Sequence, residues 1–584
     1  MRLTYVTSRK RRLIGNTGKI EICVLIFRGS CHFYHPSTAA ILGSTKVVTW
    51  WNSPKKSRGA ARTRVTLPTP RVEPVELPTG CDLEVKFKTD AAGLKLALRS
   101  DLLAIETADA PRRTLRSVYF DTPAGDLRKQ RIVLRVRKVR STHIMGLKGA
   151  RPLADAPFSR SETEVRVPRP DPDINLFGEE ISAELNRVID GHPLEQKFET
   201  QIKRRLRSLN LERSLIEVAF DEGFVVVGDR RQPLTEVELE LKAGEEAALY
   251  DLAVRLADAL PVRLEIMSKA DRGFMLTADD HPMPVRAEAL KFPADATLDQ
   301  AVEIVINDAL GQFVANWPAL TETHDRESIH QMRVALRRLR TALAFVNRVL
   351  PCPEFEIFRA EAKQIASVLG PARNWDAFKS LVEVGPLTHY ARDKGFEALL
   401  TATEERRLAA YAIAQDVIED PSTTQFVLKL RAFLARRAWR SALSGAELLR
   451  LTEPAKVFAG ETLERLHKRA LKRGRRPSQK RPEKRHEVRI ALKKIRYTAE
   501  FFHFFFSGAR PYVRAVAQLQ EGLGAFNDEA SATHLLWDIE AAAGPQAAKA
   551  AGIVLGWCER GTMIADDNLR KSWKSFRRTR PFWR

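Results

Sequence analysis

The chain contains 584 residues, about four times the roughly 150 residues of an average domain, so we expect two to four domains. Hydrophobic residues make up 44% and charged residues 29%, a composition that excludes a wholly disordered chain and a collagen-like one. Lys and Arg outnumber Asp and Glu by 96 to 73. The resulting net charge of +23 favours a polyanionic partner such as nucleic acid, a phosphate polymer or an anionic membrane.

The sequence shows neither a membrane span nor a cysteine framework. The best early apolar stretch, residues 20–27, is interrupted by Glu21 and is far shorter than the roughly 20 residues that a span requires. The cysteines lack paired spacing, which predicts neither disulfides nor a zinc site: Cys23, Cys31, Cys81, Cys352 and Cys558.

Residues 1–78 differ from the rest of the chain. They contain basic clusters, show no sustained periodicity and end in the proline-rich stretch 68–78. A signal peptide would need a clean apolar stretch and a small-residue cleavage site, and neither is convincing here. We expect a disordered extension, or residues upstream of the true start, and assign no function to it.

Residues 79–280 form the first predicted domain. Apolar and charged residues alternate there with a period of two, which is typical of strands. The clearest segments are 82–88, 117–120, 133–138, 162–167, 215–220 and 235–242. Helices are expected near 91–103, 180–188 and 245–259. Because strands mostly follow strands, we expect an antiparallel sheet or barrel.

Charged residues share one face of many of these strands. In residues 235–242, Glu236, Glu238 and Glu240 lie on one face, and apolar residues lie on the other. A solvated sheet face would explain one such strand. The pattern recurs, however, with both signs of charge: Asp82, Glu84 and Lys86; Arg135 and Arg137; Glu162, Glu164 and Arg166; Glu217 and Asp221. In a closed barrel this face becomes a polar tunnel, in which carboxylates select Mg²⁺ or Mn²⁺ and cations bind phosphate.

A family resemblance agrees with this interpretation. The segment Asp82-Leu-Glu84-Val-Lys86 resembles the Glu-x-Glu-x-Lys signature of CYTH domains, the triphosphate tunnel metalloenzymes. The resemblance continues in the family's order to Ser268-Lys269-Ala-Asp-Arg272-Gly. One departure is Asp82, which keeps the charge of the first signature glutamate but is one methylene shorter.

The resemblance implies an α+β multidomain protein that begins with an antiparallel eight-stranded β-barrel tunnel. It implies metal-dependent hydrolysis of inorganic triphosphate or a related triphosphate, with Mg²⁺ or Mn²⁺ as cofactor. The implied metal ligands are Asp82, Glu84, Glu162, Glu164, Glu217, Asp221, Glu238 and Glu240. The implied phosphate-binding residues are Arg116, Arg135, Arg137, Lys148 and Arg204, with Lys86 and Lys269 as catalytic cations.

After a linker at 281–295, residues 296–578 show helical periodicity and an internal repeat. The segment His330-Gln-Met-Arg-Val-Ala-Leu-Arg-Arg-Leu-Arg340 matches His486-Glu-Val-Arg-Ile-Ala-Leu-Lys-Lys-Ile-Arg496, and similar Leu-Gly…Asn-Asp segments follow at similar spacing. We therefore expect an all-α domain of two related helical halves.

Each repeated helix carries a histidine and a basic stripe. Helical spacing places two sets of residues along helix sides: His330, Arg333, Arg337 and Arg338; and His486, Arg489, Lys493 and Lys494. A solvated face, or a core histidine, would explain either helix alone, but the duplication argues against both. Residues 461–500 hold 15 Lys/Arg against five Asp/Glu, and a histidine in such surroundings should be neutral at pH 7.

This arrangement resembles the CHAD domain, a conserved-histidine α-helical domain that commonly follows a CYTH domain. The resemblance implies that the eight stripe residues bind inorganic polyphosphate. We therefore expect inorganic triphosphate and polyphosphate as partners and a cytoplasmic protein, potentially at polyphosphate granules. Three alternatives remain: a catalytically weak polyphosphate-binding protein, an adenylate cyclase on the same barrel, and a nucleic-acid binder. The last is the weakest, because the basic helices lack interleaved aromatics and a base-reading module.

Overall fold

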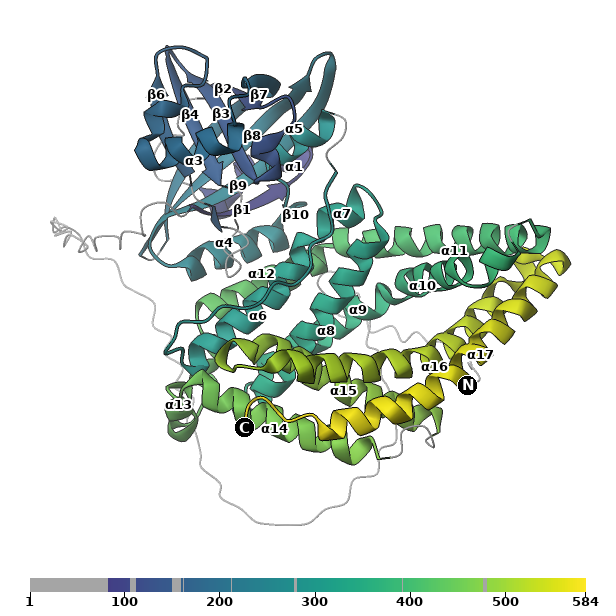
Figure 1. Cartoon of the computed structure of the whole chain (residues 1–584). Coiled ribbons are helices and arrows are strands. Elements are labelled where there is room, and N and C mark those ends of the chain that lie inside the picture. Colours follow the sequence, from purple (N-terminus) through teal and green to yellow (C-terminus); the bar gives the residue numbers. More distant parts are fainter. Residues whose placement is uncertain are drawn as a thin grey trace, which may run out of the picture. The chain divides into compact units, whose positions relative to one another are not determined.

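The computed structural model describes residues 82–104, 112–149, 159–160, 162–211, 213–277, 281–390, 392–475 and 481–584. The predicted extension 1–78 lies outside these residues, and so does the side chain of Asp82. A β-sheet with flanking helices occupies the first described part of the chain, and helices make up the second (Figure 1).

The first part contains ten strands, and every pair that forms is antiparallel. Nine strands form one continuous path in the order β10-β1-β9-β8-β7-β2-β3-β4-β6, and β5 pairs with β1 off this path. Their bounds are β1 Asp82–Lys88, β2 Arg113–Asp121, β3 Ile132–Val139, β4 Thr142–Gly149, β5 Ser159–Arg160, β6 Glu162–Val167, β7 Glu195–Leu211, β8 Ser214–Val227, β9 Arg230–Ala243 and β10 Arg263–Glu265.

The predicted closed eight-stranded barrel is wrong, because the sheet is an open path. The unpredicted strand β10 pairs with residues 86–88 of β1 and occupies the edge along which the last strand, β6, would have to pair. Only the two residues of β5, which precede β6 in the chain, reach β1, opposite Asp82 and Leu83. The antiparallel topology itself was predicted correctly.

The two faces of the sheet differ as the alternating pattern predicts. On β1, Leu83, Val85 and Phe87 are buried in a hydrophobic core. This core also contains residues of β8, β9, α1 (Ala91–Arg99) and α4 (Glu246–Ala259). A second cluster packs α3 (Glu179–Ile189) and the short α2 (Asp126–Lys129) against β3 and β4. The charged side chains are left on the concave face, where α5 (Lys269–Leu276) packs.

Described residues 281–297 form no helix, and helices follow to residue 578. They are α6 Leu298–Ala315, α7 Trp317–Thr321, α8 Arg326–Val349, α9 Pro353–Val368, α10 Gly370–Val384, α11 Lys394–Glu419, α12 Pro421–Ala435, α13 Gly445–Leu451, α14 Ala455–Arg473, α15 Pro482–Phe502, α16 Ala509–Ala543 and α17 Ala548–Arg578.

The two predicted histidine helices are α8 and α15, and each buries its apolar stripe. Met332, Leu336 and Leu339 of α8 are fully buried. The corresponding residues of α15, from Val488 to Ile495, belong to a separate core with residues of α14, α16 and α17. Among the described residues, no helix combines the length and the apolarity that crossing a membrane requires.

Candidate functional site

The concave face of the sheet encloses a cavity of about 440 Å³. Its wall is formed by residues of β1 to β4, of β6 to β9 and of the start of α5. Because side chains alternate between the two faces of a strand, residues two apart on one strand reach the cavity together. Twelve of the predicted site residues line it: Glu84, Lys86, Arg135, Arg137, Lys148, Glu162, Glu164, Arg204, Glu217, Glu238, Glu240 and Lys269.

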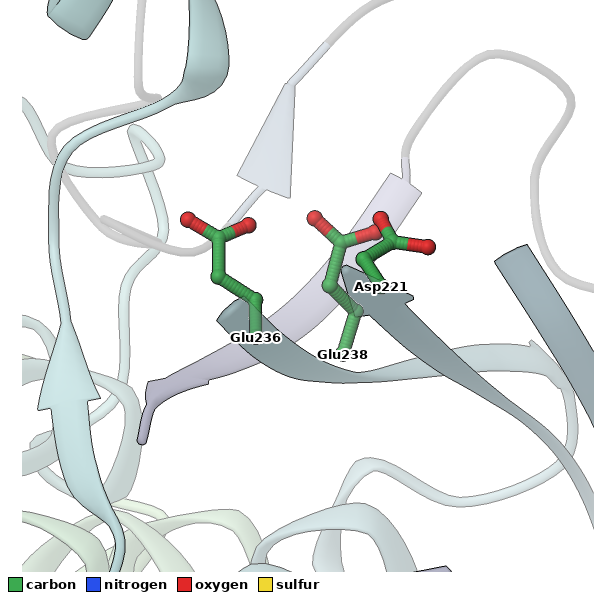
Figure 2. Close-up of side chains that lie close together, drawn as sticks. All are labelled: Asp221, Glu236 and Glu238. Atoms are coloured by element: carbon green, nitrogen blue, oxygen red, sulfur yellow. The ribbon is translucent and has the colours of Figure 1, made fainter. Parts of the chain in front are cut away.

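Three carboxylates, which we call the first acidic cluster, lie at one end of this face: Asp221, Glu236 and Glu238. Asp221 stands opposite Glu236 on the neighbouring strand, and one carboxylate oxygen from each of the three lies within 4.8 Å of the others. Figure 2 shows the three side chains rising from the same side of β8 and β9. Glu236 was missed as a ligand candidate, although its period-two spacing from Glu238 was the signal that could have identified it.

Two cations neutralise the first acidic cluster. Lys269 Nζ lies 3.0 Å from Asp221, 2.8 Å from Glu236 and 2.6 Å from Glu238. Arg204 forms ion pairs of 2.5 Å with both Asp221 and Glu238. The Lys269 ammonium therefore occupies the centre of the group in which a metal ion would otherwise be expected.

The protonation equilibria reflect this pairing. Burial alone would raise the pKa of Glu238, but Lys269 and Arg204 hold it well below its usual value. Burial would lower the pKa of Lys269, but the surrounding carboxylates raise it well above its usual value. Burial raises the pKa of Glu236, although Lys269 opposes this shift. The cluster is thus a buried network of compensated charges.

Helix α5 fixes Lys269 in position. Ser268 and Asp271 form a reciprocal capping box that begins the helix at Lys269. One turn further, a Cβ at Gly273 would lie 2.0 Å from the ring of Phe198, so only glycine permits this approach. Arg272 of the same helix adds a third cation beside the cluster, 3.7 Å from Glu236 and paired with Glu265 of β10.

A second acidic cluster consists of Glu84, Glu217 and Glu240 on three adjacent strands. Glu240 of β9 stands directly opposite Glu84 of β1 and Glu217 of β8. Directly opposed residues place their Cβ atoms about 5 Å apart, so the carboxylates repel one another. Burial raises the pKa of Glu240, the Lys242 ammonium opposes the shift, and Glu217 and Glu84 add to it. Oxygen donors in this arrangement fit a hard divalent cation.

Other predicted ligands contact cations instead of either acidic cluster. Arg135 forms ion pairs with Glu162 at 2.5 Å and with Glu164 at 3.0 Å. Lys148 contacts Glu162 at 2.7 Å. Burial would lower the pKa of Arg135, but Glu162 foremost and Glu164 raise it. Glu162 and Glu164 therefore hold the basic wall of the cavity in place.

Arg137 differs from the other cavity cations. Its Nε donates to Ser117 Oγ at 3.2 Å, and among the described residues no carboxylate lies within ion-pair distance. Burial, followed by Arg135 and Arg204, lowers the pKa of Arg137 to about 10. An uncompensated guanidinium on this wall is suited to an anionic ligand.

The structure places Arg116 outside the cavity. Ser117 and Tyr119 of β2 face the concave side, so the pleat turns Arg116 to the opposite face. There Arg116 is largely exposed and forms a 2.6 Å ion pair with Glu199. Sequence spacing alone does not define which face of β2 is concave.

One histidine and four cations from α8 and α15 form what we call the histidine site: His330, Arg333, Arg337, Arg489 and Lys493. Arg337 Nε donates to Tyr497 Oη of the other helix at 3.2 Å, and Arg333 donates to a backbone carbonyl of α9. Among the described residues, no carboxylate lies within ion-pair distance of the four cations.

This crowding lowers the pKa values of the site. Burial first, and then Arg489, Arg337 and Arg333, lower the pKa of Lys493 to about 7, while Asp528 of α16 opposes the shift. Burial and Arg373 lower the pKa of His330 to about 4. A pKa this low leaves the His330 imidazole neutral at pH 7.

Three predicted polyphosphate-binding residues lie elsewhere. Arg338 is only 2% exposed, pairs with Asp308 at 2.8 Å and donates to Gln312. One residue corresponds to about 100° of helix rotation, which turns Arg338 from the side of Arg337 into the core. Lys494 turns away from Lys493 in the same manner, and His486 is exposed, unlike half-buried His330.

Comparisons with known families identify both parts of the chain. Residues 82–274 match the model of the CYTH domain, and residues 304–537 match the model of the CHAD domain. The protein therefore belongs to the class of CYTH-domain proteins that carry a CHAD domain after the sheet, as the resemblance predicted.

Two relatives match parts of this chain. The chain is 30% identical over 171 residues to an inorganic triphosphatase of Haemophilus influenzae, a match that covers 28% of this chain and 46% of that protein. It thus spans about half of that relative. A match of 25% identity to an uncharacterised Mycobacterium tuberculosis protein covers 73% of this chain and 84% of the relative.

Among solved structures, the CHAD domain of the plant Ricinus communis is 30% identical, with a TM-score of 0.44, and covers 51% of this chain and 98% of that domain. A Hippeastrum protein described as a putative adenylyl cyclase with a dominant triphosphatase activity is 18% identical, with a TM-score of 0.26. The match covers 34% of this chain and 96% of the Hippeastrum protein.

Proposed function

We propose that the CYTH domain hydrolyses inorganic triphosphate with a divalent cation, and that the CHAD domain binds polyphosphate. One observation carries the first part: the cavity is lined by the second acidic cluster, in which three carboxylates stand directly opposite one another beside Lys86, 3.3 Å from Glu84, and Lys242, which pairs with Glu240. The first acidic cluster already contains Lys269 and Arg204, whereas the second has carboxylates directly opposed.

The second acidic cluster is the proposed metal site. Glu84, Glu217 and Glu240 would hold Mg²⁺ or Mn²⁺, and Asp82 precedes Glu84 by two residues on the same strand. A cation bound there would neutralise charge on the phosphate oxygens and orient water. Lys269, proposed from the sequence as a catalytic cation, would act as a positioning residue by holding Asp221, Glu236 and Glu238.

The basic wall is the proposed phosphate site. Arg137 has no carboxylate partner among the described residues, so its guanidinium is the cation best able to bind a phosphate oxygen. Arg135 lies two residues away on the same strand, β3, and Lys148 lies on the neighbouring strand, β4. In the reaction, water attacks a terminal phosphorus and a bridging P–O bond breaks. Orthophosphate, pyrophosphate and a proton are released.

The lining of the cavity favours an inorganic substrate. It is dominated by ionised side chains, and Tyr119 is the aromatic residue on it. The ring of Tyr119 is already stacked on Phe198, with centroids 4.4 Å apart. A nucleobase would need an apolar or aromatic surface to stack on, so we expect inorganic triphosphate to be a better substrate than ATP.

The histidine site supports the second part of the proposal. Arg333, Arg337, Arg489 and Lys493 have no ion-pair partner among the described residues, and burial and mutual repulsion lower the pKa values of Arg333, Arg489 and Lys493, with Asp528 offsetting part of the shift for Arg489 and Lys493. A phosphate polymer would supply the missing negative charge, and neutral His330 could donate a hydrogen bond.

A substrate panel with the full-length protein tests the proposal. Purified protein is incubated with tripolyphosphate, long-chain polyphosphate or ATP, with and without Mg²⁺ or Mn²⁺, and orthophosphate and cyclic AMP are quantified. We expect metal-dependent orthophosphate release, fastest from tripolyphosphate. Cyclic AMP and pyrophosphate from ATP would identify a cyclase instead. Binding of tripolyphosphate without turnover would identify a binding protein.

A further inference from the structure

A second group of cations lies on the CHAD domain beside the histidine site. It draws on four helices, and we call it the side basic cluster: Arg340 of α8, Arg359 of α9, Arg469 and Arg473 of α14, and Lys494 of α15. Burial lowers the pKa of Lys494, and the charges of Arg469, Arg359, Arg473 and Arg340 lower it further. These side chains therefore share one electrostatic environment.

The side basic cluster is poorly compensated. Arg359 pairs with Glu356 at 2.5 Å, on the surface of the same helix. In the part of the chain that the structure describes, no carboxylate lies within ion-pair distance of the other four cations. Arg340 Nε is buried and has no hydrogen-bond partner. Holding these charges together costs free energy, which a bound anion would recover.

This cluster is not part of the duplicated arrangement. The residue that corresponds to Lys494 in the first half is Arg338, which is buried against Asp308. The residue that corresponds to Arg340 in the second half is Arg496, whose Nε donates to Glu500 at 2.7 Å. The internal repeat therefore accounts for the histidine site but not for the side basic cluster.

The two sites are contiguous along α8 and α15. Arg340 follows Arg337 by three residues on α8, which is less than one helical turn of about 5.4 Å. On α15, Lys494 follows Lys493 but is turned from it by about 100°, to a side on which Arg340 and Arg469 lie near it. Burial, then Arg359 and Arg337, lower the pKa of Arg340. Arg340 thus interacts electrostatically with both the side basic cluster and the histidine site.

We propose that the side basic cluster is a second anion-binding site that extends the histidine site, so that a long polyphosphate chain occupies both. This inference rests on the proposed binding of polyphosphate by the CHAD domain. A long chain can contact the cations of both sites along its length, whereas a triphosphate offers only three phosphate groups to them. The side basic cluster would therefore give the protein its preference for long chains.

The test compares two triple variants of the full-length protein. The first is Arg359→Gln with Arg469→Gln and Lys494→Gln. The matched control is Arg392→Gln with Lys394→Gln and Arg406→Gln, which removes the same charge from exposed positions in and before α11. Binding of long-chain polyphosphate and of tripolyphosphate is measured by calorimetry over a range of salt concentrations, and circular dichroism verifies the fold.

We expect the side-cluster variant to bind long-chain polyphosphate at least tenfold more weakly than the control, with little change for tripolyphosphate. The slope of log affinity against log salt should fall by about two, because each lost contact with a flexible polyanion removes about 0.7. Equal affinities and slopes for the two variants would overturn the inference but leave the proposed function intact. No polyphosphate binding by the wild-type protein would overturn both.

Discussion

Polyphosphate binding should depend on pH through Lys493. This side chain is largely buried, and Arg489, Arg337 and Arg333 face it from α15 and α8, while Asp528 faces it from α16. Its pKa in the free protein is about 7, far below the usual value of about 10.4. A bound polyanion favours the protonated amine, so it raises this pKa and binding takes up a proton.

The sign and size of the effect follow from this linkage. Below pH 7 the amine is protonated in both states, so affinity is nearly constant. Above pH 7 the free protein loses the proton and the complex retains it, so affinity falls up to tenfold per pH unit. With a free pKa of about 7 and a bound pKa above 9, the loss between pH 7 and pH 9 is about 50-fold.

The assay is calorimetry with long-chain polyphosphate, which carries few titrating end groups, at constant ionic strength. Repeating it in buffers of different ionisation enthalpy measures the proton uptake directly. Lys493→Met should bind weakly and Lys493→Arg tightly, and both should lose the pH dependence between pH 7 and 9. His330, with a pKa of about 4, does not titrate in this range. The reasoning is refuted if wild-type affinity is constant over this range, or if Lys493→Met retains the slope.

Three further substitutions test other parts of the account. Lys269→Met removes the ammonium that neutralises Asp221, Glu236 and Glu238, so urea denaturation should show a loss of stability of about 3–5 kcal/mol. The control Lys242→Met, which breaks an exposed ion pair, should cost about 1 kcal/mol or less. Arg338→Met removes the buried cation that pairs with Asp308 and should lower stability by about 3–5 kcal/mol without weakening polyphosphate binding of the folded protein. Weaker binding with unchanged stability would contradict the assignment of Arg338 to the core. Arg137→Met should lower kcat/KM for tripolyphosphate about tenfold to hundredfold, because this is the rate equivalent of losing one hydrogen bond to a charged group. Undiminished activity would show that Arg137 does not belong to the phosphate site.

Much of the sheet could be predicted because its strands alternate cleanly. The predicted strands 82–88 and 162–167 match β1 and β6, since one face of each carries charge. The two short strands β5 and β10 could not be predicted. They contain two and three residues, too few for a period to appear, yet β10 decides that the sheet remains open.

The sequence also predicted most of the cavity lining, because period two places charged residues on one face. It could not tell which carboxylates pair with cations. Glu162 is directed to Arg135 and Lys148 by the register of β3, β4 and β6, and Lys269 reaches the first acidic cluster from a helix distant in sequence. Such pairings depend on tertiary structure.

Helical spacing was less decisive than strand spacing. Positions three, four, seven and eight residues apart form a broad side rather than one line, so Arg338 and Arg337 were both assigned to the basic stripe. The structure separates them, because Asp308 and Gln312 of α6 attract Arg338 into the core. An acidic residue on a neighbouring helix cannot be paired with Arg338 from the sequence alone.

The central claim is that the second acidic cluster holds the metal that drives triphosphate hydrolysis. The most direct test measures Mn²⁺-dependent orthophosphate release from tripolyphosphate by the Glu240→Gln variant. The control variant is Glu195→Gln, at an exposed position of β7. An amide of similar volume preserves packing but removes the charge that a cation requires. We predict that Glu240→Gln remains folded and loses activity, whereas Glu195→Gln retains it. Wild-type turnover by Glu240→Gln would contradict the account.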